Sequence, residues 1–238
     1  MDKKTTSDLP LSYSMFESTS RVGWTQLLNP TPEEKRIFKV LDFYLNHAKL
    51  KELERTGWIK WNVSGRRESV AEHSSSAQGI AWALYSEYEL ELDIYKVISM
   101  LSIHEEGESI IGDIIKYDVK ATETKAEREK AAVDSICGNL KRGNIIVSLF
   151  DEFEAKETPE AKFAFLCDKL DCDLQAKLYS DKGRCSIANA TYEMVSNEQI
   201  QEILENGAKT VFEVFWEADM HYYTDSFLEG FFLKLKEL

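Results

Sequence analysis

Residues 31–53, TPEEKRIFKVLDFYLNHAKLKEL, have the pattern of an amphipathic helix with a marked start. Thr31 is suited to cap the helix, Pro32 fits the first turn because its missing N–H has no partner there, and Glu34 can reach back to the cap. Apolar residues then recur with the helical period, at Ile37, Val40, Leu41, Tyr44 and Leu45. We therefore expect a helix that ends near Leu53.

The remainder of the chain continues this helical pattern. Only 4 prolines and 11 glycines interrupt the 238 residues, and the long segments between them show the helical period rather than the alternation of strands. Further helices are expected to begin at Ser69, Asp93, Thr124 and Thr158, and two more to cover 197–218 and 222–236. The helix from Asp93 is expected to run through His104, and the helix from Thr124 to end at Gly143 in a left-handed turn.

These segments predict a single all-α bundle with extensions at both ends. Residues 1–30 are the least regular and are expected to form an N-terminal arm. The helical domain is expected over 31–180, and a C-terminal helical extension over 181–238 is expected to pack on the same domain.

Composition excludes several functional classes. The 29 Lys and Arg residues against 42 Asp and Glu give a formal net charge of −13, which disfavours nucleic-acid polymers and anionic membranes because both need a basic face. With 43% hydrophobic and 30% charged residues, the chain has the composition of a folded globular protein. No apolar run is long enough for a membrane-spanning helix, and the polar N-terminus does not resemble a secretory signal. An anionic substrate would therefore need a metal ion or an arginine cluster to overcome the acidic field locally.

The four cysteines have the spacing expected of free thiols in a reducing compartment. Cys137, Cys167, Cys172 and Cys185 form no C-x-x-C pair, and their spacing suits neither a zinc knuckle nor a small disulfide scaffold. They are expected to be reduced, buried thiols in a cytoplasmic protein.

Two of the four histidines are candidates for chemistry. His47 and His221 lie in polar or junction positions and are expected to be structural. His73 lies one turn inside its helix among small residues, a setting that suits a metal ligand and a surface histidine equally. His104 ends an apolar run and is followed by a group of acids.

The acids after His104 favour a bound cation. A run such as Glu105, Glu106 and Glu108 is most often a solvated face, but here it begins where a buried helix should still face inward, so it would repel itself without a cation. Asp168 also sits between apolar residues, whereas the nearby Asp171 and Asp173 are expected to face water. Two imidazoles with two carboxylates suit one divalent transition metal ion, and manganese, cobalt, iron and zinc all remain open.

Three strings in this chain together resemble the HD-domain metal-dependent phosphohydrolases, and most of all their 5′-deoxynucleotidase branch. They are ESVAEHS at 68–74, IHEEGESIIGD at 103–113 and DKLDCDLQA at 168–176. Histidines and aspartates are common, so the combination of the three strings is far more specific than any single one. The resemblance covers roughly residues 35–180 and implies an HD-like helical bundle.

The resemblance implies a ligand set for the metal ion, made of His73, His104, Glu105 and Asp168. The family has aspartate at the position of Glu105, which is the main departure of this chain. The added methylene requires the carboxylate to fold back or the ion to shift, so a catalytically impaired site is the alternative.

The resemblance also implies two catalytic acids. Glu108 would orient or deprotonate the attacking water, or protonate the leaving 5′-oxygen, and Asp113 would lie beside the substrate. For both residues the alternative is a structural carboxylate at a helix end or turn.

Anion recognition is expected from the segment before the first metal ligand. Arg55 and Trp58 resemble the family's substrate-side loop, and Arg66 and Arg67 lie just upstream of the helix of His73. Arginine can bind phosphate in a bidentate way and tryptophan can stack on a base. The alternatives are surface charges for the two later arginines and a core position for Trp58.

These inferences converge on a phosphohydrolase that releases phosphate from nucleoside 5′-monophosphates, with deoxyribonucleotides favoured. The alternatives are a nucleotide triphosphohydrolase or phosphodiesterase with the same metal site, and a non-catalytic nucleotide-binding protein. The expected partner is a small nucleotide, without nucleic-acid polymer or membrane, and the resemblance favours a homodimer.

Overall fold

The computed structural model describes residues 31–236 apart from 116, 118–121 and 225–227, so the expected N-terminal arm lies outside the described residues. Within these ranges the chain forms helices and no strand, and its one extended pairing is an isolated bridge between Glu54 and Ser69. The prediction of an all-α protein is therefore confirmed.

The helices in chain order are α2 (Pro32–Lys49), α3 (Thr56–Lys60), α4 (Val70–Glu87), α5 (Ile94–Leu101), α6 (Glu108–Ile111), α8 (Lys125–Cys137), α9 (Gly143–Ala155), α10 (Pro159–Asp181), the 3-10 turn η3 (Ile187–Asn189), α11 (Tyr192–Val195), α12 (Glu198–Glu205), α13 (Val211–Thr224) and α14 (Glu229–Lys236).

Local capping accounts for four of the helix starts. The side chains of Thr31, Ser69, Asp93 and Thr158 each accept a hydrogen bond from the backbone N–H three residues further on. At the first two positions a glutamate returns a bond to the cap, which completes a capping box. These starts were all predicted because every group involved lies within one helical turn.

Two expected helix ends are wrong. Helix α5 ends at Leu101, and His104 lies in the turn that follows, where backbone bonds such as that from the Glu106 N–H to the Ile103 carbonyl span three residues instead of four. Gly143 begins α9 and does not end α8; a Cβ there would lie 1.8 Å from the carbonyl oxygen of Cys137. This glycine is therefore required by a close approach of two backbone segments and not by a left-handed turn.

The C-terminal part holds more helices than the two expected. In place of one helix over 197–218, the chain forms α12, a break, and α13. Gly207 lies at the break with φ of 111°, a conformation that other residues rarely adopt. This glycine ends α12 and allows α13 to take a new direction.

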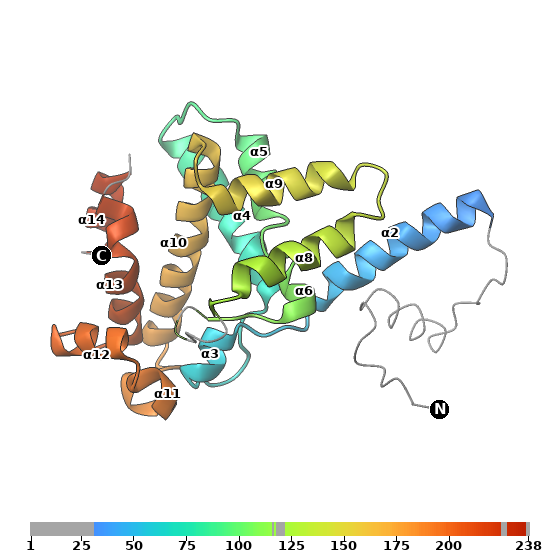
Figure 1. The fold of residues 1–238 in the computed structure, drawn as a ribbon. Helices are drawn as coiled ribbons and strands as arrows, with labels where there is room; N and C mark the ends of the chain where they lie inside the picture. Colours follow the sequence, from blue (N-terminus) through green and yellow to red (C-terminus); the bar gives the residue numbers. More distant parts are fainter. Residues whose placement is uncertain (1–30, 116, 118–121, 225–227, 237–238) are drawn as a thin grey trace, which may run out of the picture.

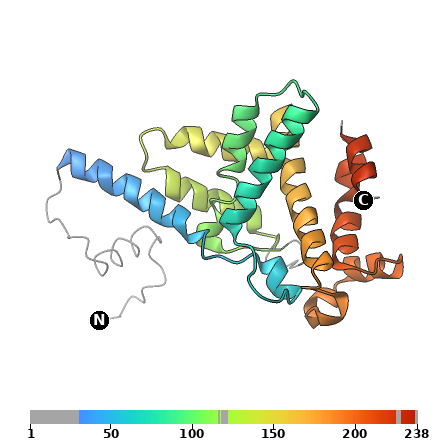
Figure 2. The ribbon, with the colours of Figure 1, turned by 180° about the vertical axis from the view of Figure 1, so that it is seen from behind.

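Helix α10 is the centre of the packing. It contacts α4, α5 and α9 on one side and α13 on the other, and α14 lies beside α13 (Figures 1 and 2). The core between these helices is formed by fully buried side chains such as Met100, Leu101, Phe163 and Trp216. Because α10 is covered on several sides, even its polar residues are buried, and this brings acidic side chains into the interior. None of the described helices is both long and apolar enough to cross a membrane.

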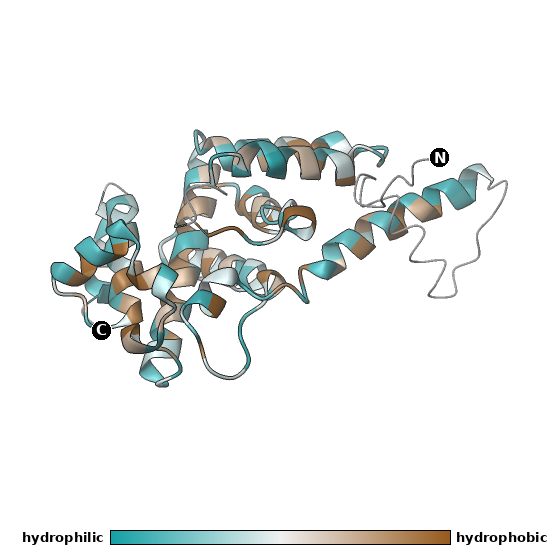
Figure 3. Cartoon of the chain, turned by 60° about the horizontal axis from the view of Figure 1, so that its bottom comes forward, coloured by the Kyte–Doolittle hydropathy of each residue, from teal (hydrophilic) through white to brown (hydrophobic). Residues whose placement is uncertain are grey.

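Helix α2 projects from this body (Figure 1). Its contacts are with α6 and α8, and His47 near its end binds Glu106, with 2.8 Å between Nδ1 and Oε2. Hydrophilic and hydrophobic residues alternate along the projecting part (Figure 3), where Ile37 and Val40 are exposed.

Asp173 illustrates how far the burial of α10 departs from expectation. The prediction that it faces water is wrong, since its side chain is fully buried and one carboxylate oxygen accepts a hydrogen bond of 2.5 Å from the Tyr223 hydroxyl of α13. The ring of Tyr223 packs against Trp216 and Phe232. A polar link thus joins α10 to α13 inside an otherwise apolar contact.

We expect Tyr223→Phe to lower the free energy of unfolding by about 2 kcal/mol, because the buried carboxylate loses a donor while the ring contacts remain. Urea unfolding followed by circular dichroism measures this change. Tyr222→Phe is the matched control, since the neighbouring tyrosine is exposed and its ring contact with Phe165 survives the substitution. Equal effects of the two substitutions would show that the buried hydrogen bond contributes nothing.

Candidate metal centre

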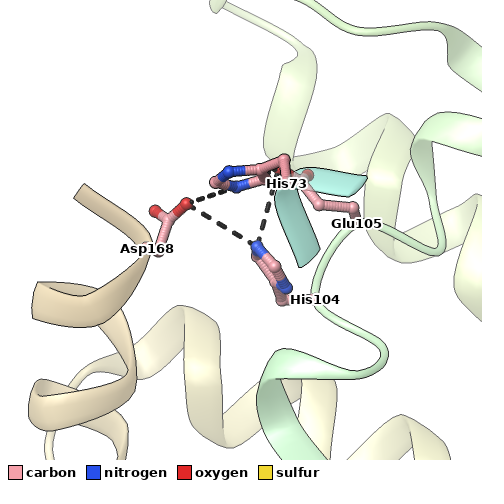
Figure 4. A group of neighbouring side chains, drawn as sticks. All are labelled: His73, His104, Glu105 and Asp168. Carbon is pink, nitrogen blue, oxygen red and sulfur yellow. Dashed lines mark hydrogen bonds and ion pairs between the residues drawn. The ribbon is translucent and has the colours of Figure 1, made fainter. Parts of the chain in front are cut away.

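Four side chains from three segments converge in the interior (Figure 4). His73 comes from α4, His104 and Glu105 come from the turn after α5, and Asp168 comes from α10. One donor atom of each residue lies within 4.8 Å of the donor atoms of the others. The structure thus brings together the four residues that the resemblance implied as metal ligands.

The donor atoms face a common point. Asp168 Oδ1 lies 2.9 Å from His73 Nε2 and 3.6 Å from His104 Nε2. Glu105 Oε1 lies 3.6 Å from the same two nitrogens. His104 Nε2 is buried and has no hydrogen-bond partner among the described residues. A buried nitrogen without a partner is costly unless a further group binds it, so this geometry fits a cation between the four side chains.

The second ring nitrogen of each histidine, Nδ1, contacts an oxygen acceptor outside the cluster. Asp171 Oδ2 lies 2.7 Å from His73 Nδ1, and the Leu101 carbonyl oxygen lies 3.0 Å from His104 Nδ1. These acceptors favour a proton on Nδ1, which leaves the Nε2 lone pair directed at the cluster. Asp171 was expected to face water, and that expectation is wrong: it is 5% exposed and lies one turn after Asp168 on the same face of α10.

Neighbouring charges set the protonation states of His73 and Asp168 in the cluster. Burial and Arg55 oppose a charged His73, yet its hydrogen bonds to Asp168 and Asp171 raise its pKa to about 9. Burial alone would raise the pKa of Asp168, but Lys169 and the two histidines hold it well below its usual range. The aspartate therefore stays ionised, and a divalent ion would displace the proton from the imidazole.

Glu105 reaches both the cluster and a buried arginine. Its Oε1 accepts a hydrogen bond of 2.8 Å from Arg55 Nη1, while Arg55 Nη2 lies 3.1 Å from the Cys172 sulfur. Burial would raise the pKa of Glu105, but His104, Arg55 and His73 lower it to about 2. The longer side chain of glutamate is thus accommodated, with its carboxylate ionised and shared between the cluster and Arg55.

A cavity of about 370 Å³ opens onto this cluster. Its walls include an aromatic group, in which Trp58 of α3 and Trp61, directly after α3, contact Phe215 of α13 with ring centroids 5.1 and 6.2 Å apart. Charged side chains from six segments line the remaining walls: Arg55, Glu105, Glu108, Asp113, Lys125, Glu129, Glu154, Lys156, Asp168, Lys169 and Asp219. A ligand in this cavity would meet an apolar wall and a charged wall at once.

Glu108 and Asp113 both line the cavity, beside the cluster. Glu108 is buried, with Oε1 3.4 Å from Lys125 Nζ; burial, Glu105 and Asp113 raise the pKa of Glu108 well above its usual value. Asp113 Oδ2 accepts a hydrogen bond of 2.5 Å from the Thr56 N–H, and the Thr56 hydroxyl donates to the Asp113 carbonyl. These bonds join the segment after α6 to the start of α3, and residues of both segments line the cavity.

The structure separates the residues expected on the substrate side. Arg55 and Trp58 line the cavity, although Trp58 is almost fully buried and its Nε1 donates to Glu68 at 3.0 Å. Arg66 binds Glu72 on the surface, with 77% of its side chain exposed, and Arg67 binds Glu54 at 3.0 Å. Neither of these two arginines lines the cavity. Glu72 lies in the first turn of α4, and Glu54 lies at the isolated bridge to Ser69. These two ion pairs hold both guanidinium groups away from the cluster.

Three lysines of the cavity were not anticipated from the sequence. Lys125, Lys156 and Lys169 line its walls, from α8, from the end of α9 and from α10. Lys169 follows Asp168 directly, which was the only available signal. The other two come from segments that reach the cavity through packing, and no local pattern marks them.

We expect Arg55→Ala to lower kcat/KM for a nucleotide about 10- to 100-fold, because Glu105 loses the partner that orients its carboxylate. Arg66→Ala should change kcat/KM less than about threefold, since it removes only a surface ion pair. Steady-state phosphate release measures both. A loss at Arg66 as large as that at Arg55 would place the phosphate site elsewhere.

Comparison with known proteins agrees with this geometry. The HD domain family matches residues 47–211. The 5′-deoxynucleotidase HDDC2 of Dictyostelium discoideum is 34% identical over 146 residues, which cover 58% of this chain and 76% of that protein. The 5′-deoxynucleotidase HDDC2 of Homo sapiens is 31% identical over 144 residues, covering 60% of this chain and 69% of that protein.

Solved structures share the fold. The PH0347 protein from Pyrococcus horikoshii has a TM-score of 0.53 and 26% identity, and the match covers 76% of this chain and 96% of that one. A protein from Magnetospirillum magnetotacticum, described as a "predicted metal-dependent phosphohydrolase", has a TM-score of 0.52 and 32% identity over 61% of this chain and 73% of that one. Since the family match spans most of the helical bundle and all four clustered residues, this chain belongs to the HD domain family.

Proposed function

We propose that this HD-domain phosphohydrolase releases phosphate from nucleoside 5′-monophosphates, with deoxyribonucleotides preferred. The observation that carries the proposal is the convergence of His73, His104, Glu105 and Asp168 on one point at the wall of a cavity large enough for a nucleotide. The relatives named 5′-deoxynucleotidases support this substrate class.

The four clustered residues would hold one divalent transition metal ion, either manganese, cobalt, iron or zinc. When bound, such an ion lowers the pKa of a coordinated water and polarises a phosphate. Asp171 and the Leu101 carbonyl keep both imidazoles oriented toward it. An ion held there would offset the acidic field of the chain for an anionic substrate.

Glu108 is the proposed acid–base residue. It lies in the cavity wall next to the cluster, and Lys125 fixes the direction of its carboxyl group. From this position it can take a proton from the attacking water or give one to the leaving 5′-oxygen, and its buried surroundings favour the protonated form and hence the second role.

The remaining cavity walls are proposed to bind the nucleoside. Asp113 lies beside the Arg55–Thr56 backbone and is proposed to contact the sugar. Trp58, with Trp61 and Phe215, offers an aromatic wall to the base. The proposed substrate is a small nucleotide, and we propose that the active form is a homodimer.

A phosphate-release screen tests this function. Purified protein is stripped with a chelator, reloaded separately with manganese, cobalt, iron or zinc, and assayed against ribo- and deoxyribonucleoside mono-, di- and triphosphates. We expect metal-dependent release from 5′-monophosphates, fastest with the deoxyribose series. If no metal raised the melting temperature and no nucleotide released phosphate, a non-catalytic nucleotide-binding protein would be the correct description.

A further inference from the structure

Glu68 is a buried acid that the proposed mechanism does not use. It directly precedes Ser69, the residue that caps α4 and pairs with Glu54 in the isolated bridge. Only 7% of Glu68 is exposed, and it is not among the residues that line the cavity. A buried carboxyl group is costly unless its surroundings bind it, so the partners of Glu68 are informative about its role.

The backbone and the side chain of Glu68 both bind residues of the cavity wall. Its carbonyl oxygen accepts a hydrogen bond of 3.0 Å from the N–H of Arg55, the residue before α3. Its Oε2 accepts a hydrogen bond of 3.0 Å from Trp58 Nε1. Arg55 and Trp58 both line the cavity. One residue outside the cavity thus fixes the start of α3 and the orientation of the indole that α3 carries.

Ring contacts extend the effect of this hydrogen bond along the aromatic wall. The Glu68 N–H donates to the Tyr179 hydroxyl at 2.9 Å, and the Tyr179 ring packs edge-on against Trp58 with ring centroids 5.1 Å apart. Trp58 in turn stacks on Phe215, with ring centroids 5.1 Å apart and 21° between the ring planes. The orientation of Trp58 therefore determines how these packed rings face the cavity.

Glu68 also adjoins the metal centre. Glu68, His73 and Asp171 each place one possible donor atom within 4.8 Å of the other two. Asp171 Oδ2 lies 2.7 Å from His73 Nδ1, whereas His73 Nε2 lies 2.9 Å from Asp168 in the cluster. A single buried carboxyl group is thus bonded to Trp58 and lies close to the residue that orients a metal ligand.

We propose that Glu68 is a positioning residue, which fixes the aromatic wall relative to the metal cluster through Trp58 and so determines how tightly the base of a nucleotide binds. The proposal rests on the proposed function, because it takes this wall as the site of the base. Since Glu68 does not line the cavity, it acts through Trp58. Its loss should weaken binding of the nucleoside part and leave binding of phosphate at the cluster almost unchanged.

The two products of the proposed reaction are the probes, because they report binding without turnover. Isothermal titration calorimetry of the manganese-loaded full chain measures the affinities for 2′-deoxyadenosine and for orthophosphate. Glu68→Met keeps the length of the side chain and removes the acceptor. In this variant we expect the affinity for deoxyadenosine to fall about tenfold and that for orthophosphate to change less than about threefold. Glu68→Gln should retain most of the deoxyadenosine affinity, because its amide oxygen can still accept from the indole.

Two further variants separate positioning from a general loss of stability. Trp58→Phe removes the same hydrogen bond from the donor side, and it tests the proposal even if Glu68→Met does not fold. It should lose deoxyadenosine affinity, and the double variant should bind no more weakly than Trp58→Phe alone, because both substitutions remove one interaction. Glu54→Met is the control. Glu54 pairs with Ser69 in the same bridge but binds Arg67 outside the cavity, so both affinities should stay unchanged.

The two proposals fail in different ways. Unchanged deoxyadenosine affinity in Glu68→Met or Trp58→Phe, equal losses for both probes, or additive losses in the double variant would overturn the role of Glu68 even if monophosphates are hydrolysed. The absence of deoxyadenosine binding by the unaltered protein would do the same. If no nucleotide is hydrolysed but deoxyadenosine binding depends on Glu68, the positioning role stands and the proposed hydrolysis is wrong.

Discussion

Asp168→Asn is expected to reduce phosphate release about 1000-fold or more and to abolish the rise in melting temperature that manganese produces. The substitution keeps the size of the side chain but removes the charge whose oxygen faces both imidazoles at 2.9 and 3.6 Å. Without that charge the cluster retains Glu105 as its only carboxylate ligand. Phosphate release at saturating nucleotide and thermal unfolding with and without manganese measure the two effects.

Asp171→Asn is the matched control for this prediction. Asp171 lies one turn further along α10, is equally buried and also contacts His73, but at Nδ1 instead of Nε2. Loss of an oriented outer partner typically costs about 10- to 100-fold, so the effect should be clearly smaller. If the two asparagine variants lost activity and manganese response to the same extent, the ion would not lie on the Nε2 side of His73.

Glu108→Gln is expected to lower kcat about 100- to 1000-fold and to leave the manganese-dependent rise in melting temperature intact. Glutamine keeps the shape of the side chain and cannot exchange a proton in the reaction. Because Glu108 lies in the cavity wall and outside the four-residue cluster, its loss should affect turnover and not metal binding. Steady-state kinetics and thermal unfolding of the same preparation separate these two outcomes.

The control for Glu108 is Glu106→Gln. Glu106 is also buried and lies two residues away, but it binds His47 of α2 and does not line the cavity. We expect it to lower the melting temperature while kcat changes less than about threefold, because the contact that it loses is structural. Glu108 would be a structural carboxylate if its glutamine variant lost stability in the same way with kcat unchanged.

Much of the helical architecture is readable from short sequence signals. Thr31, Ser69, Asp93 and Thr158 mark helix starts with groups that lie within one turn, and the structure confirms each of them. Local signals were less reliable for helix ends. Gly143 has the residue type of a left-handed terminus, yet it serves a contact with Cys137 that only the packing of α9 against α8 creates.

Burial of acidic residues on α10 was the main failure of sequence-based reasoning. Asp168 was interpreted as lying between apolar residues and was expected inside, whereas Asp171 and Asp173 were expected to face water. The structure buries all three, because helices pack on several sides of α10 and supply partners such as His73 and Tyr223. Periodicity cannot identify such partners, since they lie 98 and 50 residues away along the chain.

Short-range sequence signals specify the all-helical class, the main helix starts and the kinds of side chain available for metal and phosphate chemistry. These properties depend on interactions within one turn and on the three motif strings. Helix packing determines which atoms meet, and it joins Asp168 to His73 across 95 residues and Lys156 to Phe165 at the cavity. It leaves Arg66 on the surface, where it binds Glu72. Hydrogen bonds and ion pairs depend on distance in space, and helix packing around α10 sets those distances.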